Sequence, residues 1–189
     1  MKKFYLAAVL SALFASTAYA QKAPFSYDYV EATYEMGEAD LGNGNDLTIS
    51  SFGVNVSKSL NDTFFVAGSA TYNDVDDAGH FENYSLGLGG KISVTNSTDL
   101  VGQIAYTYWD MDEGINGVLA AVGIRHKLAD AVEVNGGYAH TELEDGSFGA
   151  FVVGLRYKFS DSFSAGLNYK HWTGDIDGNQ YGVALKLDF

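Results

Sequence analysis

The chain has 189 residues, and its 24 Asp and Glu against 11 Lys and Arg give a formal net charge of −13. The absence of Cys excludes a disulfide scaffold, a thiol nucleophile and a Cys-ligated metal site. The acidic balance argues against nucleic acid as a partner, because phosphates attract Lys and Arg, and a hydrophobic content of 47% excludes a disordered acidic chain.

The first 20 residues have the pattern of a secretory signal peptide. Two lysines at positions 2 and 3 precede an apolar stretch from Phe4 to Phe14, and Ala18-Tyr19-Ala20 forms a small-x-small cleavage site. The apolar stretch is shorter than the roughly 20 residues that a transmembrane helix needs. We therefore expect residues 1–20 to be cleaved and residues 21–189 to form one domain.

Bulky apolar residues alternate with small or polar ones through most of the remaining chain. Near the C-terminus, for example, Val183, Leu185 and Leu187 alternate with Ala184 and Lys186. A period of two is typical of β-strands with two different faces. Short Asn- or Asp-containing turns alternate with longer, Gly-rich, acidic connections, which predicts an all-β, closed, antiparallel up-and-down barrel. We expect ten strands, with eight as the alternative, over residues 25–36, 46–58, 63–73, 81–93, 99–109, 117–127, 131–140, 148–158, 163–172 and 180–189.

The alternation leaves open whether the apolar face points outward to lipid or inward around a ligand, as in a secreted lipocalin-like barrel. The length of the apolar stripes matches the roughly 9–11 residues with which a tilted strand crosses a membrane. Aromatic residues such as Tyr84, Tyr106 and Tyr181 lie toward strand ends on that face, as in interfacial girdles. These features favour an apolar face in contact with lipid.

The last nine residues combine a terminal Phe, an aromatic residue ninth from the end and apolar residues at alternate positions between them: Tyr181, Val183, Leu185, Leu187 and Phe189. Together with the signal peptide and the strand pattern, this segment resembles bacterial outer-membrane β-barrel proteins. The resemblance implies the outer membrane of a Gram-negative bacterium, reached through the periplasm, with lipid and lipopolysaccharide as partners. It also implies that the barrel-assembly machinery recognises the C-terminal segment. We expect the barrel to be a monomer without a cofactor.

Eight charged residues occupy positions that face inward in such a barrel: Glu31, Lys91, Arg125, Glu133, Arg156, Lys170, Lys186 and Asp188. The basic residues at 91, 125, 156 and 186 fall at similar heights near the short-turn end. They predict either a basic constriction that selects anions or, as we favour, an interior of ion pairs with Glu31, Glu133 and Asp188.

The longer connections carry acidic clusters without Lys or Arg. The densest are formed by Asp74, Asp76 and Asp77, and by Asp110, Asp112 and Glu113. They could bind divalent cations through carboxylate oxygens, but neither cluster is a full EF-hand loop, and solubility of the exposed end is the interpretation that we favour.

An enzymatic function is not expected. The chain has no G-x-S-x-G motif, and His126, His140 and His171 fall on the outward face. We expect a structural barrel or a narrow, passive, porin-like channel. The alternative is a surface-interaction or adhesion barrel that acts through its acidic loops, and a secreted ligand-binding barrel is less favoured.

Overall fold

The computed structural model describes residues 24–40, 46–76, 78–111 and 114–189. The predicted signal peptide lies outside these ranges. Within them, no helix is long and apolar enough to cross a membrane.

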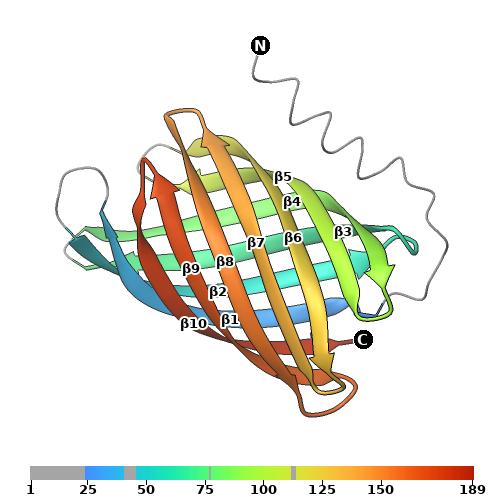
Figure 1. Ribbon diagram of the computed structural model, residues 1–189. Helices are drawn as coiled ribbons and strands as arrows, with labels where there is room; N and C mark the ends of the chain where they lie inside the picture. The colour runs from blue at the N-terminus through green and yellow to red at the C-terminus, as the bar shows by residue number, and fades with distance from the viewer. Residues whose placement is uncertain (1–23, 41–45, 77, 112–113) are drawn as a thin grey trace.

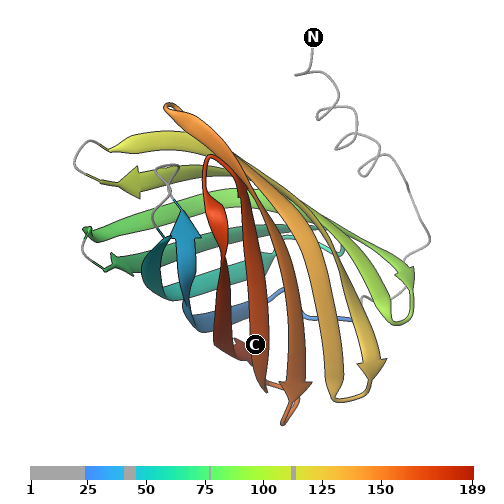
Figure 2. The ribbon, with the colours of Figure 1, turned by 60° about the vertical axis from the view of Figure 1, so that its left-hand side comes forward.

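The described chain forms ten antiparallel strands that close into a barrel, with β1 hydrogen-bonded to both β2 and β10. The blue β1 and red β10 lie side by side in Figure 1, and Figure 2 shows the tilted strands from a second direction. The ten-strand prediction is confirmed, and the eight-strand alternative is wrong. The strands are β1 (Tyr29–Asp40), β2 (Asp46–Ser59), β3 (Phe64–Val75), β4 (Gly79–Thr95), β5 (Thr98–Asp110), β6 (Ile115–Ala129), β7 (Val132–Leu143), β8 (Gly146–Lys158), β9 (Phe163–Gly174) and β10 (Asp177–Asp188).

The apolar face of the strands points outward. Leu86, Val153 and Leu167 are each more than half exposed, whereas Ala105 and Ala184, on the other face, are buried. A chain with a period of two places alternate side chains on opposite faces of the sheet, and here the bulky set covers the outside. This arrangement contradicts the lipocalin-like alternative, which needs the apolar face inside.

The two ends of the barrel differ in what they carry. We call the end with the β2–β3, β4–β5, β6–β7 and β8–β9 connections the turn end, and it also holds the start of β1 and the end of β10. The opposite end, with the acidic connections, is the loop end. Strands extend further at the loop end than expected, since Val75 pairs with Gly79 and Leu143 with Gly146. Two glycines at this end adopt positive φ angles, which other residues rarely adopt: Gly79 in the β3–β4 reversal, at 93°, and Gly174 at the start of the β9–β10 reversal, at 106°.

Candidate functional site in the barrel lumen

The eight charged residues predicted to face inward all do so. Lys91 is buried, and the other seven line cavities inside the barrel. Their orientation follows from the period of two, which puts alternate residues of a strand on the same face. On that face they lie with small residues such as Gly123, Gly154 and Ala184. What these residues do in the lumen remains a prediction.

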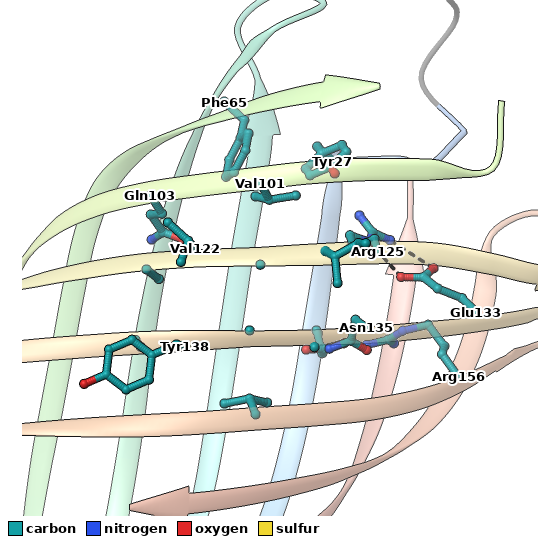
Figure 3. Close-up of a pocket in the computed structure, with 18 of the residues that line it drawn as sticks. Tyr27, Phe65, Val101, Gln103, Val122, Arg125, Glu133, Asn135, Tyr138 and Arg156 are labelled. Atoms are coloured by element: carbon teal, nitrogen blue, oxygen red, sulfur yellow. Dashed lines mark hydrogen bonds and ion pairs between the residues drawn. The ribbon is translucent and has the colours of Figure 1, made fainter. Parts of the chain in front are cut away.

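Arg125 on β6 and Glu133 on β7 form a bidentate ion pair at the turn end. Arg125 Nε and Nη2 donate to the two carboxylate oxygens of Glu133 at 2.7 and 3.0 Å, as Figure 3 shows. Both side chains are largely buried. Charge-assisted pairs of this geometry are among the stronger hydrogen bonds in proteins, and the planar guanidinium fixes the direction of both groups.

Two further ion pairs connect β1 to strands on the other side of β10. Arg156 on β8 donates to Glu31, and Lys170 on β9 donates to Glu35. A fourth pair joins Lys186 and Asp188, 2.8 Å apart on β10. Glu35 was not among the predicted lumen residues, although its position four residues after Glu31 places it on the same strand face. Arg125, Arg156, Lys170 and Lys186 each have an acidic partner, whereas the ammonium group of Lys91 lies over the Tyr27 ring.

Residues 25–28, expected to begin the first strand, instead precede β1 and, together with Pro24, fold into the lumen at the turn end. Tyr27 of this segment is only 4% exposed and donates a hydrogen bond to Asp99 at 3.0 Å. The Tyr27 ring packs against Phe65, with ring centroids 5.1 Å apart, and lies beneath the ammonium group of Lys91 at 4.2 Å. Burial raises the pKa of Tyr27 above its ordinary value.

Arg125 also holds this segment. Its Nη1 donates to the backbone oxygen of Ser26 at 3.1 Å, and its guanidinium lies 4.5 Å from the ring centroid of Phe25. The guanidinium therefore links the Glu133 carboxylate to the segment, which lies across the lumen. We call Pro24–Asp28 the N-terminal plug.

Asp99 is fully buried and was missed as a lumen residue, because its neighbours resemble a turn. The structure places it in β5, where its carboxylate accepts hydrogen bonds from Tyr27 and, at 2.7 Å, from Ser93. Its face of the strand also carries Val101 and Gln103, so the period of two identifies it as inward-facing. The contact with Tyr27 has no such local signal.

Three cavities follow one another between the loop end and the turn end. The large chamber, about 560 Å³, reaches from the β3–β4 connection to Glu31 and Arg156. The small chamber, about 300 Å³, extends from there to Tyr27 and Arg125 (Figure 3), and a cavity of about 60 Å³ lies beside Pro24 and Lys158. Arg156 lines all three cavities. The side chain of Arg156 and the N-terminal plug therefore interrupt the passage.

Aromatic residues face inward near the loop end, which the sequence analysis did not predict. Phe81 stacks on Trp109 with ring centroids 5.4 Å apart, and Phe148 contacts both Trp109 and Trp172 edge-on at 5.4 and 5.3 Å. These residues come from β4, β5, β8 and β9, so the cluster reaches over the intervening β6–β7 hairpin. It forms part of the wall of the large chamber.

The acidic residues proposed for cation binding are only partly described. Asp74, Asp76 and Asp110 are exposed at the loop end, whereas Asp77, Asp112 and Glu113 lie outside the described residues. Within the part of the chain that the structure describes, no group of three or more His, Asp or Glu residues is arranged to hold a metal ion.

The C-terminal segment presents its alternate residues on the outside of β10. These are Tyr181, Val183, Leu185, Leu187 and Phe189, each at least half exposed. The backbone N–H of Phe189 donates to the backbone oxygen of Asp28, the last residue of the N-terminal plug, at 3.1 Å. The exposed row is available to a partner, but its recognition during assembly remains a prediction.

Known proteins resemble this chain in sequence and in fold. Residues 6–189 match the family described as outer membrane protein beta-barrel domain. No curated protein matches the chain significantly. Among solved structures, it is similar to the KdgM porin in complex with disordered oligogalacturonate, with a TM-score of 0.55 and 14% identity over 85% of this chain and 99% of that chain.

Two other solved structures show the same architecture. The translocator domain of the autotransporter NalP from Neisseria meningitidis has a TM-score of 0.55 and 11% identity, over 100% of this chain and 95% of that chain. An outer-membrane channel from Pseudomonas putida F1 has a TM-score of 0.57 and 8% identity, over 92% of this chain and 100% of that chain. At these identities the likeness establishes a shared fold.

Proposed function

Because the chain belongs to the outer membrane protein beta-barrel domain family, we propose that this outer-membrane barrel is a non-enzymatic, narrow, passive channel for small polar solutes. One observation carries the proposal: the three cavities are separated by side chains, and Arg156 borders all of them. Movement of side chains and of the N-terminal plug would join the cavities, whereas a solid core would need the barrel to unfold.

The orientation of the barrel in the membrane follows from the general architecture of such barrels. Their short turns lie in the periplasm, and their other connections lie outside the cell. We assign the turn end to the periplasm of a Gram-negative bacterium and the loop end to the exterior. The chain would reach this membrane through the periplasm after cleavage of residues 1–20. The exposed row from Tyr181 to Phe189 supports recognition by the barrel-assembly machinery, and the acidic loop end would contact lipopolysaccharide through bridging cations.

Two layers, one a side-chain ion pair and the other a chain segment, would control passage. The first is the Arg156–Glu31 pair between the large and small chambers. The second is the N-terminal plug, which Tyr27, Arg125 and Asp99 hold across the periplasmic end. The barrel described here is in a closed conformation, and opening requires one or both layers to move.

The histidines support a non-enzymatic function. His140 lies 3.5 Å from Glu142 on the exposed outer rim, and His126 shares a hydrogen bond with Thr98 at 2.8 Å. Catalysis by a nucleophile needs a hydroxyl, a base and a group that orients the base. Among the described residues, no histidine combines a hydroxyl on one side with a carboxylate on the other.

Conductance in planar lipid bilayers tests the channel. We expect refolded protein to give small, intermittent currents, and the double variant Glu31→Ala/Arg156→Ala to give larger and longer openings, because the layer between the two chambers is removed. The matched control is Glu35→Ala/Lys170→Ala. It also deletes one acidic and one basic side chain that form an ion pair, but this pair lines the large chamber alone. Folded protein and folded Glu31→Ala/Arg156→Ala variant that both leave the bilayer electrically silent would refute the channel.

A further inference from the structure

We infer that the large chamber is a binding site for a neutral saccharide of one or two sugar rings. The inference rests on the proposed function, since it names the class of solute that this lumen accepts. The volume of the large chamber, about 560 Å³, falls within the range of about 300–1,000 Å³ that is typical of small-molecule sites. The choice of ligand depends on the chemistry of the wall, which combines three features.

The first feature is an array of side-chain amides. The residues Asn55, Asn73, Asn83, Asn135, Asn168 and Gln180 all line the chamber. A primary amide offers two donors and an acceptor, and a sugar hydroxyl both donates and accepts. Amides therefore match neighbouring hydroxyl groups on a sugar ring without requiring any net charge on the ligand.

On one wall these amides are fixed by their neighbours. Gln180 donates to Ser51 at 3.3 Å, Ser51 donates to Asn73 at 2.8 Å, and Asn73 donates to Asn83 at 2.9 Å. This chain of hydrogen bonds orders the polar groups before any ligand arrives. Pre-ordered groups bind more tightly because less conformational freedom is lost on binding.

On the opposite wall the amides are available. Asn135 on β7 and Asn168 on β9 both pair with Gly154 on β8 and lean over it, so that a Cβ at Gly154 would lie 2.5 Å from Asn135 Oδ1 and 2.9 Å from Asn168 Oδ1. Neither side chain makes a hydrogen bond within the described part of the chain. The glycine thus leaves room for two amides that converge on the cavity with unused donors and acceptors.

The second feature is aromatic. Phe81, Trp109 and Trp172 line the same chamber, and the indole N–H of Trp172 donates to Gln180 at 3.3 Å. The face of a sugar ring that carries its C–H groups packs against aromatic rings, while the hydroxyls at its edge reach polar partners. Aromatic and amide groups around one cavity fit this two-sided character.

The third feature is charge balance, which favours a neutral ligand. The chamber's acidic residues Glu31 and Glu35 are paired with Arg156 and Lys170. The charges of the wall are therefore balanced within the pairs, and a ligand of either sign would add an uncompensated charge to the chamber. Arg156 Nη1, which has no hydrogen-bond partner in the described part of the chain, can donate to a neutral sugar oxygen while its pair with Glu31 stays in place. A neutral saccharide leaves both pairs intact.

Intrinsic fluorescence provides a direct test, because both tryptophans of the chain, Trp109 and Trp172, line this chamber. The full barrel, refolded in an amine-oxide detergent that contains no sugar, is titrated with maltose, and with glucuronate and glucosamine as charged probes. Folding of every variant is checked by its heat-modifiable migration on gels. We expect a saturable change in tryptophan emission with maltose and a response at least tenfold weaker to either charged sugar.

The variants locate the site. The double variant Asn135→Ala/Asn168→Ala should raise the apparent Kd for maltose at least tenfold, whereas Asn96→Ala, the same substitution in the exposed β4–β5 turn, should leave it unchanged. Calorimetric titration with maltose should show the same ranking independently of fluorescence. The inference is overturned if folded protein gives no saturable response to maltose, if a charged sugar binds more tightly, or if the double variant binds maltose as the native barrel does.

The conductance measurement separates this inference from the proposed function. A barrel that binds maltose but carries no current would contradict the channel alone. A barrel that conducts ions but does not bind maltose would contradict the saccharide site alone.

Discussion

At the scale of single residues, one guanidinium does more than any other group to organise the periplasmic end of the lumen. Arg125 pairs with Glu133 through two hydrogen bonds, donates to Ser26 and packs against two aromatic rings of the N-terminal plug. Its side chain and that of Glu133 are 15% and 8% exposed. A buried charge without its partner is costly, because the interior does not replace the water that the charge has lost.

The variant Arg125→Met should therefore destabilise the barrel strongly. We expect a loss of about 3–5 kcal/mol in the free energy of unfolding, the range found when one partner of a buried pair is removed. Urea-induced unfolding of the barrel from phospholipid vesicles measures this loss. Adding Glu133→Gln to Arg125→Met should recover part of it, since the stranded carboxylate is then neutral.

The matched control is Lys58→Met, which removes the exposed partner of Asp28. Exposed pairs contribute about 0–1 kcal/mol, so this variant should stay close to the native stability. Equal losses for the 125 and 58 variants would show that burial of the Arg125–Glu133 pair has little energetic weight.

At the scale of elements, each strand has one face for the lumen and one for the membrane. The residues on β8 show both roles: Val153 and Leu155 point outward and are about half exposed, whereas Gly154 and Arg156 face the lumen. Small residues on the inner face let neighbouring side chains lean inward, as Gly89 does for Phe65, whose ring occupies the space that a Cβ would take. The same alternation therefore creates the lipid contact and the cavities.

The substitution Val153→Arg tests the lipid-facing assignment of β8. Val153 is the eighth of the 13 residues of the strand, close to the middle of the membrane, where an arginine on the lipid face costs about 2–4 kcal/mol. Urea-induced unfolding from vesicles should show this loss. The control Ser162→Arg, in the exposed β8–β9 turn, should cost about 0–1 kcal/mol, as expected near the interface. A tolerated arginine at 153 would contradict contact with lipid at that depth.

At the scale of the whole molecule, closure of the barrel determines how the chain meets its surroundings. Pairing of β1 with β10 over twelve residue pairs leaves no free sheet edge among the described strands. Every strand hydrogen-bonds to two neighbours, as the membrane interior requires, since it offers no water to satisfy backbone groups. The outer surface is correspondingly apolar, and the charge of the chain collects at its ends and in its lumen.

Membrane fractionation tests this picture. After expression in a Gram-negative host, the protein should stay with the membranes during extraction by urea or alkaline carbonate and should be released only by detergent. The apolar outer face provides the reason, because it has no favourable contact with water. The control is a soluble periplasmic protein of the host, which is followed in the same fractions. Recovery of the folded chain without detergent would contradict an integral location.

The strands and their two faces could be predicted from the sequence because a period of two is a local property that each strand carries by itself. The inward positions of Glu31, Arg125 and Arg156 follow from that period. The extra length of strands at the loop end does not, because acidic and Gly-rich residues are typical of loops, and their pairing depends on the neighbouring strand. Glu35, Asp99 and the inward aromatics were accessible to the same alternation but were not singled out.

The sequence by itself therefore determined where most strands run and which charged residues share the face opposite the bulky apolar ones, since both depend on residues close together in the chain. The count of ten rather than eight strands and the outward direction of the apolar face were decided by closure of the barrel. Tertiary structure alone decided which groups meet. Tyr27 bonds to Asp99, 72 residues away, and Arg156 reaches Glu31 across 125 residues. Such contacts depend on the stagger and closure of the barrel, which bring distant strands to one height, and the division of the lumen into chambers follows from them.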